Sequence, residues 1–181
     1  TPQMLQTLDT ADLSLVRGSK ILYADWYDGD HILRAMDEAK AQNVPVFVNL
    51  EHGHKKSEVL KKFADRVTIC QAVTDAAQIG GKQALLGTAR KLLKSGIQIA
   101  IITLAKGGCL VAEGEKIVRV FAPSVKAVDA CGAGATFSAG FIYGYLKKWN
   151  LESCARFATA AATLKVTRAG LQMFPVKQIM E

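Results

Sequence analysis

Short apolar runs alternate with amphipathic stretches along most of this chain. Runs typical of buried strands lie at 21–24, 44–50, 67–71 and 97–104. Between them, apolar residues at helical spacing predict helices over 31–41, 57–64 and 82–94, the last closed by Gly96. Strands and helices that alternate in this way imply an α/β fold, with a mostly parallel sheet flanked by helices on both faces.

The second half of the chain changes the pattern. Two short strands, 109–112 and 116–121, are joined by the turn Glu113-Gly114-Glu115 and predict a hairpin at the sheet edge. Two long helices follow, over 132–148 and 151–166. Ligands of parallel sheets bind beyond the carboxyl ends of the strands. The turn at 103–108 follows such an end, and we expect the start of helix 132–148 to converge on the same edge.

Length and composition predict one domain over residues 1–181 that is large enough for a substantial core. Half of the residues are hydrophobic, but no apolar run approaches the length of a membrane span. The cysteines are too far apart for a zinc site or an obvious disulfide, and we expect reduced thiols in a cytoplasmic protein. They are Cys70, Cys109, Cys131 and Cys154.

The formal net charge of +7 does not by itself indicate a nucleic-acid partner. Lysine and arginine are scattered over the predicted helices, and no basic run is interleaved with aromatic residues, as single-strand binding would need. A solvated basic surface, with mild attraction for anionic nucleotides, is the better interpretation.

A glycine-rich turn carries the strongest chemical signal. The segment from Asp129 reads D-A-C-G-A-G-A-T-F and leads directly into helix 132–148. Gly132, Ala133 and Gly134 have small or no side chains, so their N–H groups and the helix dipole predict a hole for an anion, most plausibly phosphate. The alternative is a tight loop that lets the helix pack closely on the sheet. At the next position, Ala135 presents only a methyl group.

Three segments in this order together resemble the ribokinase-type (PfkB) carbohydrate kinases. They are T-L-A-K-G-G from Thr103, D-A-C-G-A-G-A-T-F from Asp129, and V-T-R-A-G-L-Q from Val166 with Pro175 after it. The resemblance implies a ribokinase-like fold and ATP-dependent phosphoryl transfer to a sugar hydroxyl, with Mg²⁺ and, as a further option, K⁺. It covers the later, larger part of such a kinase. The N-terminal portion and its β lid, which make most sugar contacts, have no counterpart here.

We therefore expect a nucleotide-binding domain that is a fragment of a larger kinase fold. A small sugar-like substrate would be bound by the full-length protein rather than by this chain alone. The missing lid would expose an apolar edge, for which a homodimer is one possible cover.

By resemblance, Ala135 stands where the family carries the aspartate that accepts the proton of the sugar hydroxyl. Alanine binds no proton, and general-base catalysis is typically worth about 10²–10⁴-fold in rate. Thr136 cannot replace the aspartate because its pKa is far too high and its side chain points about 100° away around the helix. We expect weak or moderate ATP binding and turnover near background.

The resemblance also implies two metal sites. Asp129 and Gly170 would help to hold a monovalent cation between two loops, although Phe174 stands where a small polar residue is usual. The alternative for Asp129 is a carboxylate that caps its own turn. Asp75 would organise Mg²⁺ through water in a weakened site, since Ala72 replaces an asparagine; a plain helix start is the alternative.

The remaining implied contacts concern the nucleotide. Thr103, Lys106 and Gly108 would lie near its phosphates and ribose, while Thr159 and Ala162 would line an adenine pocket on the last long helix. Close helix packing explains the last two equally well, and Lys106 could be an ordinary exposed turn residue. Ala105 replaces the glycine expected in the turn.

Two other classes of function stay open. A non-catalytic nucleotide-binding or interaction module would explain departures from the family pattern at Ala72, Ala105, Ala135 and Phe174. A structural domain that binds no ligand is the second alternative.

Overall fold

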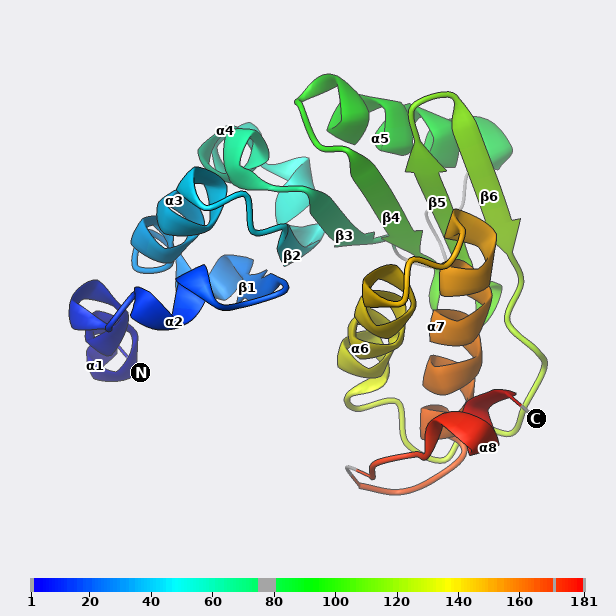
Figure 1. Cartoon of the computed structure of the whole chain (residues 1–181). Coiled ribbons are helices and arrows are strands. Elements are labelled where there is room, and N and C mark those ends of the chain that lie inside the picture. Colours follow the sequence, from blue (N-terminus) through cyan, green and yellow to red (C-terminus); the bar gives the residue numbers. More distant parts are fainter. Residues whose placement is uncertain (1, 75–80, 171, 181) are drawn as a thin grey trace.

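The computed structural model describes residues 2–74, 81–170 and 172–180, and Figure 1 shows their arrangement. Within these ranges a sheet of six strands runs in the order β1-β2-β3-β4-β5-β6. Strands β1 (Leu22–Asp25), β2 (Val46–Glu51), β3 (Ile69–Val73) and β4 (Ile99–Thr103) are parallel. Strands β5 (Cys109–Glu113) and β6 (Lys116–Val120) form an antiparallel hairpin beside β4. The mostly parallel sheet and its edge hairpin are confirmed.

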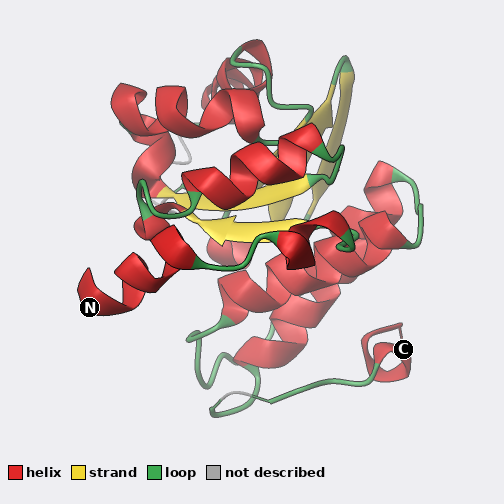
Figure 2. Cartoon of the chain, turned by 60° about the vertical axis from the view of Figure 1, so that its left-hand side comes forward, coloured by secondary structure: helices red, strands yellow, loops and turns green. Residues whose placement is uncertain are grey.

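Helices cover both faces of this sheet, as Figure 2 shows. One face carries α3 (Leu33–Ala41), α4 (Ser57–Phe63) and α5 (Lys82–Lys94). The other carries α6 (Ala133–Leu146) and α7 (Leu151–Val166), which lie side by side. The short helices α1 (Pro2–Gln6) and α2 (Ser14–Arg17) lie near β1, and α8 (Val176–Met180) lies near α7. The two-sided cover is the α/β arrangement predicted from the apolar pattern.

Two hydrophobic cores result from the alternation of side chains along the strands. On β2, Val46 and Val48 belong to the core under α3, α4 and α5, whereas Phe47 between them packs with Phe141 of α6. All four side chains are essentially inaccessible to solvent. Because both faces of β2 are buried, its sequence is a continuous apolar run rather than an alternating one.

The α6–α7 pair depends on residues without bulky side chains. A Cβ at Gly140 of α6 would lie 2.9 Å from the Cα of Ala158 in α7. Real Cβ atoms do not approach a neighbouring backbone so closely, so the glycine permits the contact between the helices. In the described part of the chain, none of the helices combines the length and hydrophobicity that a membrane span requires.

Two glycine-to-alanine substitutions test this close packing. Gly140→Ala should lower the free energy of unfolding by about 1–3 kcal/mol, because the added methyl group overpacks the α6–α7 contact. Gly87→Ala in α5 is the matched control, since a Cβ there meets nothing within 4 Å. It should raise the same quantity by about 0.5–1 kcal/mol through helix propensity. Urea denaturation measures both, and an equal, stabilising effect at the two sites would contradict the packing account.

Candidate functional site

The start of α6 has the open geometry that an anion-binding turn needs. Gly132 precedes the helix in the left-handed conformation, with φ 80°, and lets the chain turn sharply into it. The N–H of Ala133 donates to the carbonyl of Ala130 at 3.2 Å, which closes the turn. Gly134 and Ala135 follow in the first helical turn, where N–H groups have no preceding helical carbonyl to bind. Both residues are exposed.

Gly134 is not explained by packing. Outside its own helix turn, a Cβ at this position would meet one side-chain atom, Nε2 of Gln71, at 4.0 Å, and no backbone within that distance. The space beside Gly134 is therefore open, in contrast to the crowded Gly140 in the same helix. This favours the anion-hole interpretation of the turn over the close-packing alternative.

Two buried polar side chains fix the turn to the sheet. Gln71 of β3 is fully buried, and its Nε2 donates to the carbonyl of Gly134 at 3.4 Å. Ser138 of α6 donates from Oγ to Oε1 of Gln71 at 2.9 Å. The first turn of α6 therefore lies beside β3. Gln71 was not among the predicted site residues, although a glutamine inside an apolar strand was the available signal.

The segment 103–108, predicted to lie near the nucleotide, begins at the end of β4, the strand beside β3. The hydroxyl of Thr103 donates to the carbonyl of Ala72 in β3 at 3.3 Å, and the Thr103 carbonyl accepts from the N–H of Thr74 at 3.2 Å. Lys106 is exposed in a short 3₁₀ turn, Ala105–Gly107. Because β3 and β4 are adjacent and parallel, this turn and the start of α6 occupy one edge of the sheet, as expected.

Backbone geometry gives Gly108 a structural role. It has φ 83°, and a Cβ would lie 2.2 Å from the carbonyl oxygen of Val120. Glycine is therefore required where the turn passes the end of β6, whatever the turn binds. Ala105 has φ 47°, in the left-handed region that residues with a side chain rarely adopt, so the turn carries backbone strain at this position.

Arg119 of β6 forms hydrogen bonds with the backbone of the same turn. The sequence did not predict this role. Its guanidinium donates to the carbonyl of Gly107 at 2.6 Å and to that of Cys109 at 2.8 Å. It also lies over the ring of Phe121, 4.3 Å from the centroid. None of these contacts could be inferred from an arginine in a short strand pattern.

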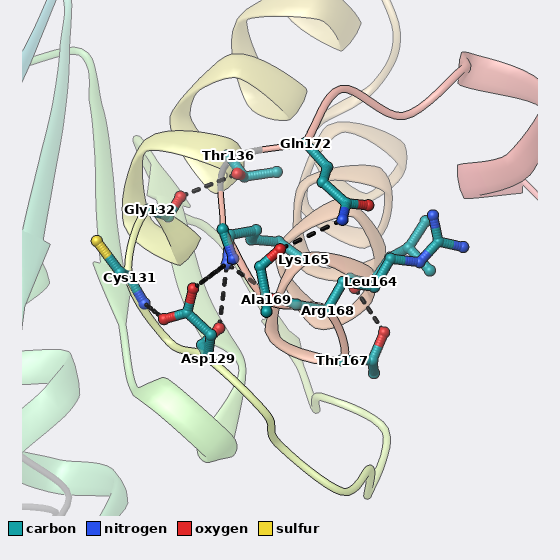
Figure 3. A network of polar contacts seen from close by, with 11 residues as sticks. Asp129, Cys131, Gly132, Thr136, Leu164, Lys165, Thr167, Arg168, Ala169 and Gln172 are labelled. Carbon is teal, nitrogen blue, oxygen red and sulfur yellow. Dashed lines mark hydrogen bonds and ion pairs between the residues drawn. The ribbon is translucent and has the colours of Figure 1, made fainter.

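Asp129 connects the turn before α6 to the segment after α7, as Figure 3 shows. Its carboxylate accepts from the N–H of Cys131 at 2.9 Å and from the N–H of Gly170 at 3.0 Å. These two backbone donors, followed by the ammonium of Lys165, lower the pKa of Asp129 below its usual value. The structure brings Asp129 and Gly170 together as expected. Toward the carboxylate, however, Gly170 presents an N–H donor, which is not a cation ligand.

The residues predicted for an adenine pocket face the protein interior. Thr159 is buried, its hydroxyl donates to the carbonyl of Ala155 at 2.8 Å, and it lies 3.5 Å from Sγ of Cys109. Ala162 packs against the core between α7 and the sheet. These contacts favour the helix-packing alternative for both residues.

Two cavities lie elsewhere among the described residues. One of about 450 Å³ is lined by Trp149, Arg156, Phe157 and Ala160 with residues of α8, and one of about 380 Å³ lies beside Phe141 and Tyr145. Neither is lined by the glycine turn, by Thr159 or by Ala162.

The predicted magnesium residue, Asp75, lies outside the described residues, so its role stays a prediction. Ala72, one residue before the end of β3 at Val73, is fully buried in the core under α5. Within the ranges that the structure covers, no three histidine, cysteine, aspartate or glutamate side chains gather as a metal site.

Ala135 presents an exposed methyl group at the position of the expected base. The next residue offers no replacement, because the Thr136 hydroxyl donates to the carbonyl of Gly132 at 2.9 Å within the helix. The site therefore has N–H donors for an anion but no carboxylate at the position from which a base would act.

Comparison with known proteins identifies the family. Residues 3–178 match the pfkB family of carbohydrate kinases, and the chain belongs to this family. An ATP-dependent 6-phosphofructokinase of Thermoanaerobacterium thermosaccharolyticum is 31% identical over 121 residues, which are 66% of this chain and 38% of that protein. A ribokinase of Arabidopsis thaliana is 29% identical over 168 residues, or 88% of this chain and 44% of the ribokinase.

Solved structures show the same fold. The ribokinase of Arabidopsis thaliana, complexed with ribose and ATP, superposes with a TM-score of 0.80 at 24% identity. The match covers 93% of this chain and 57% of the ribokinase. A ribokinase of Thermotoga maritima gives a TM-score of 0.74 at 21% identity, covering 96% of this chain and 59% of that one. The chain thus spans little more than half the length of these structures, and less than half of the two curated relatives.

Proposed function

We propose that this chain is the nucleotide-binding part of an ATP-dependent sugar kinase, with the phosphates of ATP received at the start of α6. Family membership supports the reaction class. The observation that carries the site is the exposed first turn of α6, where Gly134 leaves open space beside N–H groups that need acceptors. Lys106, exposed on the same sheet edge, adds a positive charge for the phosphates.

The residues of the chain fit the phosphates of ATP better than its base. Small residues at 132–135 allow oxygens to approach the backbone, and the dipole of α6 favours negative charge at this end. Bound ATP with Mg²⁺ would supply the phosphoryl group and screen its charge. The turn would orient that group and stabilise the charge that develops on it, a contribution that depends on rigid N–H donors.

Proton transfer is the step that this chain does not support. The acceptor hydroxyl, which we propose to belong to a sugar or a related small alcohol, would face the methyl group of Ala135. Without a base the rate should be lower by about 10²–10⁴-fold. We therefore propose turnover near background.

We also propose a reducing, cytoplasmic setting, which the four unpaired cysteines support. A homodimer stays a prediction.

Substitution of Gly134 tests the nucleotide site. Gly134→Val should weaken binding of Mg-ATP at least about tenfold, equivalent to about 1.4 kcal/mol, because its side chain fills the space beside the N–H groups. The fold should be retained, since that space is open. Ala139→Val, on an exposed position of the same helix, is the matched control and should bind normally. Isothermal titration calorimetry measures both, and unchanged affinity for Gly134→Val would overturn the site.

A second candidate function, a non-catalytic nucleotide-binding module, is favoured by Ala135 and by the engaged Thr136 hydroxyl. Ala135→Asp separates the two. In a silenced kinase, tested in the full-length protein that would bind the sugar, it should raise ADP release from Mg-ATP with ribose or a panel of other small sugars by about 10²–10⁴-fold, whereas Ala135→Asn should not. No gain in a variant that still binds Mg-ATP would favour the binding module.

A further inference from the structure

Lys165, near the end of α7, is a lysine buried among backbone oxygens. Its side chain is 1% exposed, and its Nζ lies 3.1 Å from the carbonyl oxygen of Asp129 and 3.4 Å from that of Arg168. The carboxylate Oδ2 of Asp129 is 3.3 Å away. An ammonium has three donors, and three acceptors are present. Figure 3 shows Nζ between the turn before α6 and the segment after α7.

These three acceptors are also the kind that hold a free monovalent cation. Hard cations prefer carbonyl and carboxylate oxygens, and carbonyls of non-helical backbone are typical ligands of K⁺ and Na⁺. The resemblance drawn from the sequence implies K⁺ at this place, held by Asp129 and by carbonyls of both loops. The residues present do not fit that ion, because the ammonium of Lys165 already lies among the oxygens. A second positive charge there would be repelled at close range in a poorly solvated place.

Other contacts show why a positive charge is useful at this point. The N–H groups of Val128 and Asp129 donate to the carbonyl of Val166 at 2.7 and 3.2 Å, and Gly170 donates to the Asp129 carboxylate. The turn that leads to the N–H groups of α6 is thus held against the end of α7. Without a cation, the carbonyl oxygens of Asp129 and Arg168 and the carboxylate oxygen of Asp129 would repel one another.

We propose that Lys165 is a built-in replacement for the monovalent cation. Its ammonium neutralises the converging oxygens, ties residues 129–132 to residues 167–170, and makes the chain independent of K⁺. Lys165 is a positioning residue, since it acts on the anion-binding turn through Asp129. The role of Lys165 in nucleotide binding rests on the proposed function. The replacement of the cation by Lys165 does not, and it has a test of its own.

The first test uses the unaltered chain. Its melting temperature should be the same in KCl, NaCl and choline chloride at equal ionic strength, and so should its affinity for Mg-ATP. A higher melting temperature in KCl than in both other salts would show that K⁺ binds the native chain, and would overturn the proposal. If Mg-ATP does not bind in any salt, the proposed function fails, while the melting temperatures still decide the cation question.

The second test replaces the side chain. Lys165→Ala removes the ammonium and leaves space among the oxygens, so it should lower the melting temperature in choline chloride by about 3–10 °C. KCl should restore part of that loss. Lys165→Met, which also removes the charge but fills the space, should be destabilised without rescue by KCl. Lys94→Ala, on the exposed end of α5, is the surface control and should change little in any salt.

Each result of this series decides the proposal. Selective rescue of Lys165→Ala by KCl supports it. If Lys165→Ala is destabilised and KCl does not rescue it, Lys165 only stabilises the fold, and the proposal is overturned. The proposal is also overturned if Lys165→Ala has the melting temperature of the unaltered chain in choline chloride. Should Lys165→Ala not fold in any salt, the salt series on the unaltered chain remains decisive.

Discussion

The carboxylate of Asp129 is the constraint on which the candidate site depends. It accepts hydrogen bonds from two backbone N–H groups, one in its own turn and one at Gly170, and it faces a buried ammonium. Gln71 holds the same turn from the sheet side through the carbonyl of Gly134. N–H groups that must bind an anion need such support, because their contribution comes from being fixed in place before the charge arrives.

The sheet explains why the turn lies where a ligand can reach it. With both faces covered by helices, access is left at the strand ends, and the first turn of α6 and the turn Ala105–Gly107 lie on one such edge. Glycine serves different purposes in these segments. Gly140 and Gly108 are required by neighbouring backbone, whereas Gly134 borders open space. This contrast separates the residues that shape the fold from the one best suited to a ligand.

The local pattern of the sequence was sufficient to predict the helices and strands, but it was not sufficient to predict the contacts between them. The apolar run of β2, the hairpin after β4 and the turn at Gly132 could be predicted because each is encoded by adjacent residues. The hydrogen bond from Gln71 to Gly134 spans 63 positions, and that from Lys165 to Asp129 spans 36. Such pairs depend on how helices pack, so neither the buried lysine nor the brace at Arg119 was predictable. Packing also turned Thr159 toward the interior, where the sequence allowed either direction.

The most direct test of the account is a titration of the ¹⁵N-labelled chain with Mg-ATP, followed by amide chemical shifts. If the start of α6 receives the phosphates, the largest changes should occur at the N–H groups of Gly132, Gly134 and Ala135, with smaller ones at Lys106. Shifts concentrated around Trp149 and Phe157, at the cavity lined by residues of α7 and α8, or no shifts at all, would contradict the account.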